Sequence, residues 1–431
     1  MESKPDYSSY SYNNLVDAFN HVDSDKYPDR FEELKHRIAH FDTSNSNQPE
    51  HINATIIGTQ NHFKFTGKTG EFFSIWTVNV LLSILTLGIY SAWAKVRTQT
   101  YFYGNTFLDG SSFRYHAKPT QILKGRIIAF VFFMAYYFSG YINLTAVAII
   151  FVAIALLMPA FIVMSMAFRM RNSSYRNVRF NFDKDLKQAY GIFLVPFILI
   201  AVYLYTLTSF EQDMNDQVKQ IGVSLWSLIL LPIVISLLYP LFEYLLVKFR
   251  VNHSSFGKSV FEFSSDVGSF YVIYIVAAFV FIPGVFIIGF VVSALIDFLT
   301  ALMSNGAEVT QTYTVYIMMI PMAALYLWVF AYIQTKRTNL IYNDTQIQGH
   351  QLQSNLQVSS MYYLYLTNTI AIACTLGLMA PWAMIRTAQY KASCTSVMSQ
   401  ESLNDFVVGQ SKEQSAYGEE IGEMFDIDLG L

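Results

Sequence analysis

Two asparagines and one glutamate are polar residues that stand inside long apolar stretches of this sequence. Asn79 lies in "FFSIWTVNVLLSIL", Asn368 in "MYYLYLTNTIAIAC" and Glu243 in "YPLFEYLLVKFR". Polar and ionisable groups inside membrane segments commonly mark the binding site or the path of a substrate or ion. Glu243 has a second interpretation, because its carboxylate can reach the membrane interface near Lys248. The three residues are therefore our candidate membrane-embedded polar groups.

The sequence contains no motif that predicts catalysis. GxSxG, HExxH, Walker A and GxGxxG patterns are all missing. The two cysteines, Cys374 and Cys394, form neither a disulfide framework nor the CxxC spacing of a zinc site. We expect no enzyme activity, no cofactor and no bound metal.

One phrase occurs twice, near opposite ends of the apolar region. "LTLGIYSAWAKVR" begins at Leu85 and "CTLGLMAPWAMIR" begins at Cys374, an offset of 289 that also aligns the two asparagines. The candidate turn residues are Thr86, Gly88, Thr375 and Gly377, and the candidate interface anchors are Trp93, Arg97, Trp382 and Arg386. Glycine permits the backbone conformations that a tight reversal needs.

Two interpretations of these phrases stay open. Phe72–Ala94 and Met361–Trp382 are each long enough to cross a bilayer as ordinary helices. Basic residues flank the first segment on both sides, however, and a crossing would require export of the polar leader before it. Re-entrant or membrane-embedded hairpins, which enter and leave on one side, remove this conflict, and we favour them.

The composition indicates a polytopic membrane protein. Of 431 residues, 53% are hydrophobic and only 14% are charged, whereas a soluble domain carries about 25% charged residues. Residues 1–62 carry ten acidic and five basic residues, and 399–431 carry eight and one. The middle, 63–398, has 22 basic and 13 acidic residues. We predict an acidic, partly disordered leader (1–62), a membrane domain with internal repeats (63–398) and an acidic disordered tail (399–431).

Six segments are long and apolar enough to span the membrane. They are approximately Ile122–Tyr141, Leu144–Phe168, Tyr190–Thr208, Val223–Val247, Phe270–Leu299 and Tyr313–Ile333. They pair into three hairpins whose inner links contain one basic residue, Lys219. Since basic residues favour the cytoplasmic side, the opposite side and both termini are predicted to be cytoplasmic.

A second repeat follows the predicted helix exits. A basic residue precedes an aromatic one by six positions at Arg97, Arg169, Arg250 and Lys336. Short alternating stretches typical of strands come next, at 106–115, 178–183, 259–264 and 345–353. The predicted fold is an all-α polytopic membrane protein with six spanning helices in three hairpins, two flanking re-entrant hairpins and short cytoplasmic strands.

The stretch "FTGKTGEFFSIWTVNVLLSILTLGIYSAWAKVRTQTYFYGNTFLDGSSFRY", Phe65–Tyr115, resembles the YjgN family of bacterial inner-membrane proteins. The hairpin count and the closing "TLGLMAPWAMIRTAQY" extend the resemblance over about 63–392. It implies a multi-pass protein of the bacterial cytoplasmic membrane. The family has no established function, so the resemblance implies no catalytic residues.

For function, the repeats and the two asparagines favour a transporter or channel for an unidentified solute. The alternative is a non-catalytic membrane scaffold or envelope-associated interaction protein, which the scarcity of charge inside the membrane segments supports. The expected partners are the lipid bilayer and its anionic head groups. No nucleic acid is expected, and the oligomeric state stays open.

Overall fold

The computed structural model describes residues 29–36, 59–215, 221–302, 307–400 and 402–410. The chain divides into two compact units, Met1–Ile57 and Gly58–Leu431. In the first unit, the described residues form a helix over 29–36. Residues 1–28 and 37–58 of the predicted leader, and 411–431 of the predicted tail, lie outside the described residues. All further elements belong to the second unit.

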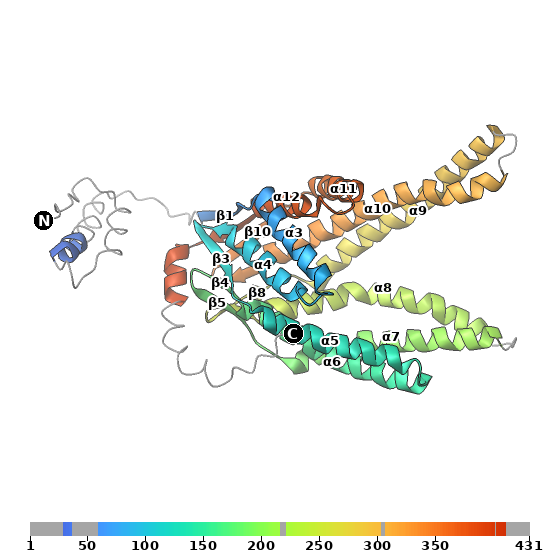
Figure 1. Ribbon diagram of the computed structural model, residues 1–431, viewed down its shortest axis with the longest axis horizontal. Coiled ribbons are helices and arrows are strands. Elements are labelled where there is room, and N and C mark those ends of the chain that lie inside the picture. Colours follow the sequence, from blue (N-terminus) through green and yellow to red (C-terminus); the bar gives the residue numbers. More distant parts are fainter. Residues whose placement is uncertain (1–28, 37–58, 216–220, 303–306, 401, 411–431) are drawn as a thin grey trace. The chain divides into compact units, whose positions relative to one another are not determined.

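Six long apolar helices confirm the prediction of six candidate spans. A helix needs about 20 apolar residues to cross the hydrocarbon core. The six are α5 (Pro119–Ser139), α6 (Leu144–Arg171), α7 (Leu186–Asn215), α8 (Ile221–Asn252), α9 (Val267–Leu302) and α10 (Ala307–Asn343). Helices that follow one another in the chain pack as the pairs α5–α6, α7–α8 and α9–α10 (Figure 1).

Two shorter helical hairpins come before and after these pairs. The first consists of α3 (Thr69–Leu85) and α4 (Ser91–Gly104), and the last of α11 (Val358–Cys374) and α12 (Ala380–Ser393). They contain the two copies of the repeated phrase. Figure 1 shows α3 to α12 extending from the same side of a β-sheet.

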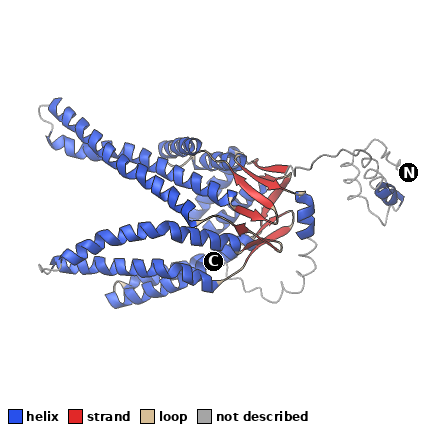
Figure 2. Ribbon diagram, turned by 180° about the vertical axis from the view of Figure 1, so that it is seen from behind, coloured by secondary structure: helices blue, strands red, loops and turns tan. Residues whose placement is uncertain are grey.

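The prediction of an all-α fold is wrong, because the second unit contains an 11-stranded antiparallel sheet (Figure 2). Its strands are β1 (Thr59–Phe65), β2 (Thr106–Leu108), β3 (Ser111–Tyr115), β4 (Ser173–Tyr175), β5 (Val178–Phe182), β6 (Ser254–Phe256), β7 (Ser259–Val260), β8 (Glu262–Phe263), β9 (Thr345–Ile347), β10 (His350–Ser354) and β11 (Thr395–Ser399). Many have only two or three residues, too few for alternation to reveal them in the sequence. The four predicted stretches overlap β2, β3, β5, β7, β8, β9 and β10, and they miss β1, β4, β6 and β11.

The sheet curves until its two edges meet in one short stretch of chain. Its edge strands are β7 and β8, which are separated by Phe261 alone. β7 pairs with β6, whereas β8 pairs with β9. At the opposite point, β1 pairs with β11 and joins the beginning of the unit to its end. The result is a nearly closed barrel.

Five similar units build this barrel. Each consists of a long strand, a helical hairpin and a short strand, and β7 with β8 acts as the long strand of the fourth unit. Each short strand begins with Ser or Thr, whose hydroxyl donates to the helix carbonyl four residues earlier. The pairs are Thr106–Phe102 (2.8 Å), Ser173–Arg169 (2.6 Å), Ser254–Arg250 (2.6 Å), Thr345–Ile341 (2.5 Å) and Thr395–Lys391 (2.8 Å).

A backbone hydrogen bond recurs in the same five units. The residue after each long strand donates its N–H to the carbonyl of the residue before the short strand. The pairs are Thr66–Asn105 (2.9 Å), His116–Asn172 (2.8 Å), Asp183–His253 (2.8 Å), Ser264–Asp344 (2.9 Å) and Asn355–Cys394 (3.0 Å). The bond ties the two ends of every hairpin together where it leaves the barrel. Five equivalent exits therefore point five hairpins away from one side of the barrel.

The structure corrects the register of the predicted exit repeat. Tyr103 and Tyr342 lie in helices, whereas Tyr175 and Phe256 lie in strands. The basic-to-aromatic spacing therefore aligned unlike positions. The residues that do correspond are the third residues of the short strands, Leu108, Tyr175, Phe256, Ile347 and Val397, which together form the barrel core.

Candidate functional site

The chain reverses at the two phrases singled out by the repeat. The Thr86 hydroxyl donates to the Leu82 carbonyl (2.7 Å) and accepts the Tyr90 N–H (2.9 Å). Gly88 has φ +91°, a conformation that favours glycine, and its N–H reaches the Ser83 carbonyl at 2.7 Å. This turn joins α3 to α4.

The turn between α11 and α12 makes the same contacts. The Thr375 hydroxyl donates to the Ala371 carbonyl (2.7 Å) and accepts the Met379 N–H (3.1 Å), and Gly377 has φ +94°. A leucine stands at each tip, and Leu87 and Leu376 are both 95% exposed. Such exposed apolar tips suit a lipid environment, although entry of these hairpins into a membrane stays a prediction.

The two asparagines hold their hairpins together from inside. Asn79 is 5% exposed and Asn368 is 6% exposed. Each donates from Nδ2 to a carbonyl of the second helix, that of Ala94 or Ala383, at 3.4 Å in both cases. Asn368 Nδ2 also donates to the Thr387 hydroxyl (3.2 Å). Each side chain therefore lies between the two helices of its own hairpin.

The repeated arginines of the two phrases contact different partners. Arg386 donates to the Thr367 hydroxyl (2.6 Å) and to Asn368 Oδ1 (3.4 Å), and its guanidinium carbon lies 5.1 Å from the centre of the Trp382 ring. Arg97 donates instead to the Tyr90 hydroxyl (3.2 Å), and the Tyr90 ring stacks on Trp93. Asn79 Oδ1 is buried, and none of the residues that the structure describes forms a hydrogen bond with it. A cavity of about 470 Å³ lined by Asn79 and Lys95 accompanies this difference.

Glu243 is buried between spanning helices. It is 5% exposed, forms an ion pair with Arg337 of α10 and accepts the hydroxyl of Tyr274 of α9. Lys248 donates to the Tyr244 hydroxyl (3.2 Å). Glu243 therefore joins the third unit to the fourth.

The barrel encloses a cavity of about 370 Å³. Its wall is formed mainly by apolar side chains from all five units, including the third residues of the short strands. Burial raises the pKa of Tyr175 above its ordinary value, so its hydroxyl stays protonated and donates to the Leu108 carbonyl (2.7 Å). The sequence does not reveal this cavity, because its lining comes from residues far apart in the chain.

A helix over residues 403–410 closes the end of the barrel opposite the hairpins (Figure 1). We call it the plug helix. Leu403 and Val407 are buried in the barrel core, and Phe406 packs against Phe256 and His350. Burying a side chain such as Leu or Val stabilises by about 1.5 to 3 kcal/mol. Residues 403–410 thus form a helix within the segment 399–431 that the sequence predicts to be a disordered tail.

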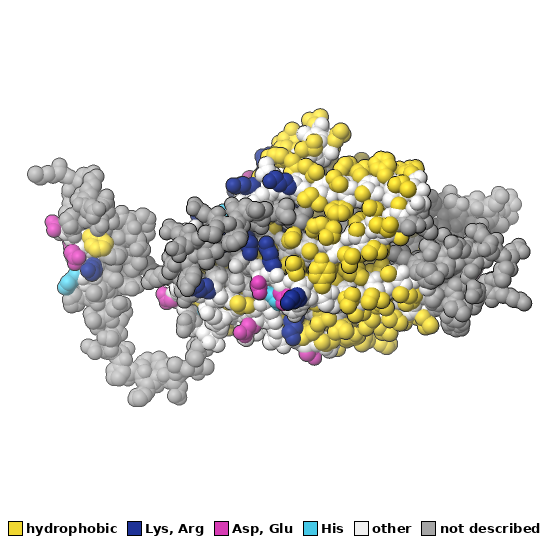
Figure 3. Space-filling view, turned by 90° about the horizontal axis from the view of Figure 1, so that it is seen from below, with side chains coloured by type: hydrophobic (Ala, Val, Ile, Leu, Met, Phe, Trp, Pro, Cys, Tyr) yellow, Lys and Arg dark blue, Asp and Glu magenta, His cyan; other side chains and the backbone are white. Residues whose placement is uncertain are grey.

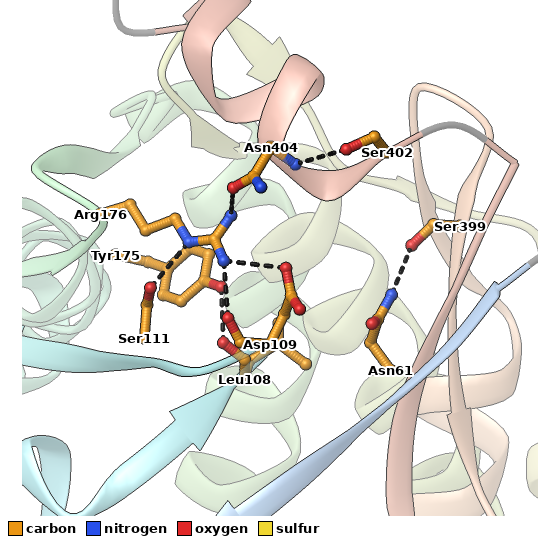
Figure 4. Close-up of polar contacts among 9 residues, drawn as sticks. All are labelled: Asn61, Leu108, Asp109, Ser111, Tyr175, Arg176, Ser399, Ser402 and Asn404. Carbon is orange, nitrogen blue, oxygen red and sulfur yellow. Dashed lines mark hydrogen bonds and ion pairs between the residues drawn. The ribbon is translucent and has the colours of Figure 1, made fainter. Parts of the chain in front are cut away.

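Polar contacts fasten the plug helix at both ends. At its start, Arg176 donates to Asn404 Oδ1, to Asp109 Oδ2 (2.8 Å) and to the Ser111 hydroxyl (2.9 Å), as Figure 4 shows. At its end, Gln410 Oε1 accepts the backbone N–H of Lys258 (2.9 Å). Arg176 lies in the turn between β4 and β5, and Lys258 lies in the turn between β6 and β7. The contacts therefore reach the second, third and fourth units. The plug helix is therefore held across the barrel mouth.

The other end of the cavity carries positive charge. Arg250, at the end of α8, is the one Lys or Arg among the residues that line the cavity. Arg337 and Arg169 lie close enough to act on it electrostatically. Partial desolvation lowers the pKa of Lys95, and the charges of Arg126 and Arg169 add to this effect. These five cations, of which only Arg250 lines the cavity, form what we call the cationic cluster, an arrangement that attracts anions.

Metal chemistry finds no support in the part of the chain that the structure describes, where no group of three or more His, Cys, Asp or Glu side chains could hold an ion. Cys374 and Cys394 are free thiols. The sequence did mark Arg169 and Arg250 as basic residues at predicted helix exits. It gave no signal that they meet beside a cavity, because that meeting depends on closure of the barrel.

Known proteins resemble this chain along most of its length. A family model described as "Bacterial protein of unknown function (DUF898)" matches residues 60–424. The chain is 24% identical over 367 residues to "Inner membrane protein YjgN" of Salmonella typhimurium strain LT2, covering 80% of this chain and 91% of that relative. It is 27% identical over 241 residues to the protein of the same name from Escherichia coli strain K12, covering 53% and 59%. No solved structure matches.

Proposed function

This chain belongs to the DUF898 family of bacterial proteins and is a multi-pass protein of the inner membrane, and from that premise we propose that it is a transporter whose pathway follows the barrel axis. One observation carries the proposal. Five units surround a single cavity, which has the cationic cluster at one end and the plug helix at the other.

The proposed orientation puts the barrel in the cytoplasm. On the face shown in Figure 3, hydrophobic side chains form a broad belt, and Lys and Arg gather along one margin of it. Basic residues of membrane proteins concentrate on the cytoplasmic side. The plug helix then closes the cytoplasmic mouth, and both termini are cytoplasmic. Reporter fusions at each end test this orientation, and a periplasmic location of either end contradicts it.

Movement of the plug helix is the step that would open the pathway. Its fastening combines apolar burial with the contacts of Asn404 and Gln410. Arg176 stays paired with Asp109 and Ser111 without Asn404, so the barrel turn keeps its own support. The double substitution Asn404→Ala and Gln410→Ala therefore weakens the closure and leaves the wall intact.

The direct test measures solute flux in vesicles that contain the purified full-length protein. The double variant is expected to increase flux of an anionic solute several-fold over the unsubstituted protein. Val408→Ala is a control on the same helix, since Val408 is 50% exposed and belongs neither to the barrel core nor to the cavity lining. Equal flux from both proteins and from protein-free vesicles, over a panel of anions, would favour the scaffold function instead.

A further inference from the structure

The barrel cavity is built for a molecule with an apolar body. Its lining includes Phe113, Phe180, Phe256 and Leu352 from the strands and Phe406 from the plug helix. Ligand pockets typically measure about 300 to 1,000 Å³ and combine apolar walls with a few placed polar groups. The observed volume of about 370 Å³ falls at the lower end of that range.

Arg250 supplies a charge where this apolar wall meets the helices. Its guanidinium makes no ion pair or hydrogen bond with any residue that the structure describes, although Arg337 and Arg169 repel it. The nearby carboxylate of Glu243 is engaged by Arg337 and by the Tyr274 hydroxyl. Glu243 also attracts Arg250, but its carboxylate pairs with Arg337, so among the described residues Arg250 has no ion-pair partner of its own.

A partly buried charge without a counter-ion is unfavourable, because the protein replaces water without offering compensation. An anion beside Arg250 removes this deficit and gains from the added field of Arg169, whereas the charge of Arg337 is offset by Glu243. An apolar tail on the same anion fills the cavity beyond it and gains from burial. A single molecule with an anionic head and an apolar tail therefore matches both the charge of Arg250 and the apolar wall of the cavity.

We propose that the barrel cavity binds an anionic amphiphile, with a carboxylate or phosphate head at Arg250 and one hydrocarbon tail directed toward the plug helix. A 150 Å³ cavity takes benzene, so this cavity suits a tail on the order of a dozen carbons. This proposal extends the proposed transport function by naming a class of ligand. It rests on that function only in taking the bound molecule and the transported molecule to be the same.

Binding is measured on the full-length protein in nanodiscs of zwitterionic lipid, with isotopically labelled dodecanoate as the probe. Dodecanol tests the head, because it keeps the tail without the charge. Acetate and inorganic phosphate test the tail, because they keep the charge alone. Dodecyl phosphate distinguishes a phosphate head from a carboxylate head.

Dodecanoate is expected to bind at least tenfold more tightly than dodecanol, acetate or inorganic phosphate. Arg250→Gln is expected to remove most of the preference for dodecanoate over dodecanol, and Arg250→Lys to retain most of it. Lys124→Gln removes an exposed charge of α5 outside the cavity lining and is the matched control, with binding unchanged. Elution volume and thermal stability establish that each variant is folded.

Several outcomes overturn the proposal. Equal affinity for dodecanoate and dodecanol removes the role of the charge, and equal affinity for dodecanoate and inorganic phosphate removes the role of the cavity. If the folded Arg250→Gln variant keeps its preference for dodecanoate over dodecanol, the head group does not bind at Arg250. Binding without flux in vesicles would contradict the proposed transport and leave the binding site standing.

Discussion

The first and last helical hairpins share a backbone but differ in how their central arginine is used. In both, a tyrosine hydroxyl accepts the N–H of the residue that precedes the first helix, Tyr101 from Lys68 (2.8 Å) and Tyr390 from Gln357 (3.1 Å). The turns make the same contacts as well. Only the last hairpin directs its arginine to the buried asparagine.

Two neighbouring positions explain the difference. Thr367, which accepts from Arg386, corresponds to Val78, which has no acceptor. Tyr90, which accepts from Arg97, corresponds to Met379, which has no hydroxyl. The residues that both phrases share therefore specify the fold of the hairpin, whereas neighbouring residues that differ decide which acceptor the arginine contacts.

The largest expected effect separates the two asparagines. Asn368→Leu leaves Arg386 without one acceptor and removes the bonds to Ala383 and Thr387, so we expect a loss of about 2 to 3 kcal/mol in the free energy of unfolding. Asn79→Leu removes one long bond and an oxygen that already lacks a partner, so we expect about 1 kcal/mol. Denaturant titration in mild detergent measures both losses. Equal losses would contradict the proposed difference between the two asparagines.

The turn glycines are expected to behave alike. Gly88→Ala and Gly377→Ala each force a side chain into a left-handed conformation, at a cost of about 1 to 2 kcal/mol. No atom lies within 4 Å of the added Cβ at either site, so the cost is that of the backbone. The same titration measures it, with Gly70→Ala in helix α3 as the unstrained control. A difference above about 1 kcal/mol between the turns would show that they are not equivalent.

Tyr90→Met gives the first hairpin the residue of the last. We expect it to release Arg97, which then reaches Asn79 Oδ1 and offsets the lost bond to Tyr90. A double-mutant cycle measures the coupling between the two positions. Asn79→Leu is expected to lower the free energy of unfolding by about 1 kcal/mol more in the Tyr90→Met variant than in the unsubstituted protein. Additive losses would mean that the arginine stays where it is.

The smallest effect is a change in pH dependence. Desolvation, aided by Arg126 and Arg169, lowers the pKa of Lys95 below 10.5, whereas Met384 occupies the corresponding place in the last hairpin. The unfolded chain then holds this proton to higher pH than the folded one, so stability rises as pH increases from the folded pKa toward 10.5. Lys95→Met should flatten that rise in unfolding curves taken between pH 8 and 10.5. Lys64→Met on β1 is the control, and an unflattened rise in the Lys95 variant would assign it to other groups.

The sequence predicted the helical part of the fold well, because length and hydrophobicity alone mark a spanning helix. The barrel was harder, since a strand such as Ser173–Tyr175 is too short to show a period. Asp109–Gly110 did carry a hairpin signal, as both residues have positive φ in a tight turn between β2 and β3. That signal identifies a local turn and says nothing of the partner strands across the barrel.

The candidate site was predictable only in part. Asn79 and Asn368 were identified as polar residues in apolar helices, yet identical residue types could not reveal that one keeps an unpaired oxygen. Arg250 was identified as a basic residue of one membrane side. Its position at a cavity depends on strands from five separate units and on a plug helix near the end of the chain.

The pairing of β1 with β11 also sets the order in which the molecule is completed. Gln60 donates to the Ser396 hydroxyl, 336 residues farther along the chain. During synthesis, β1 is made before the other strands of the barrel. Its partner β11 is made only after every spanning helix. Unpaired strand edges readily join other chains, and contacts distant in sequence form slowly. A ribosome that stops before residue 395 therefore releases a chain in which β1 and β10 are unprotected edges in addition to β7 and β8, so translation of the last strand removes two of the edges at which self-association can begin.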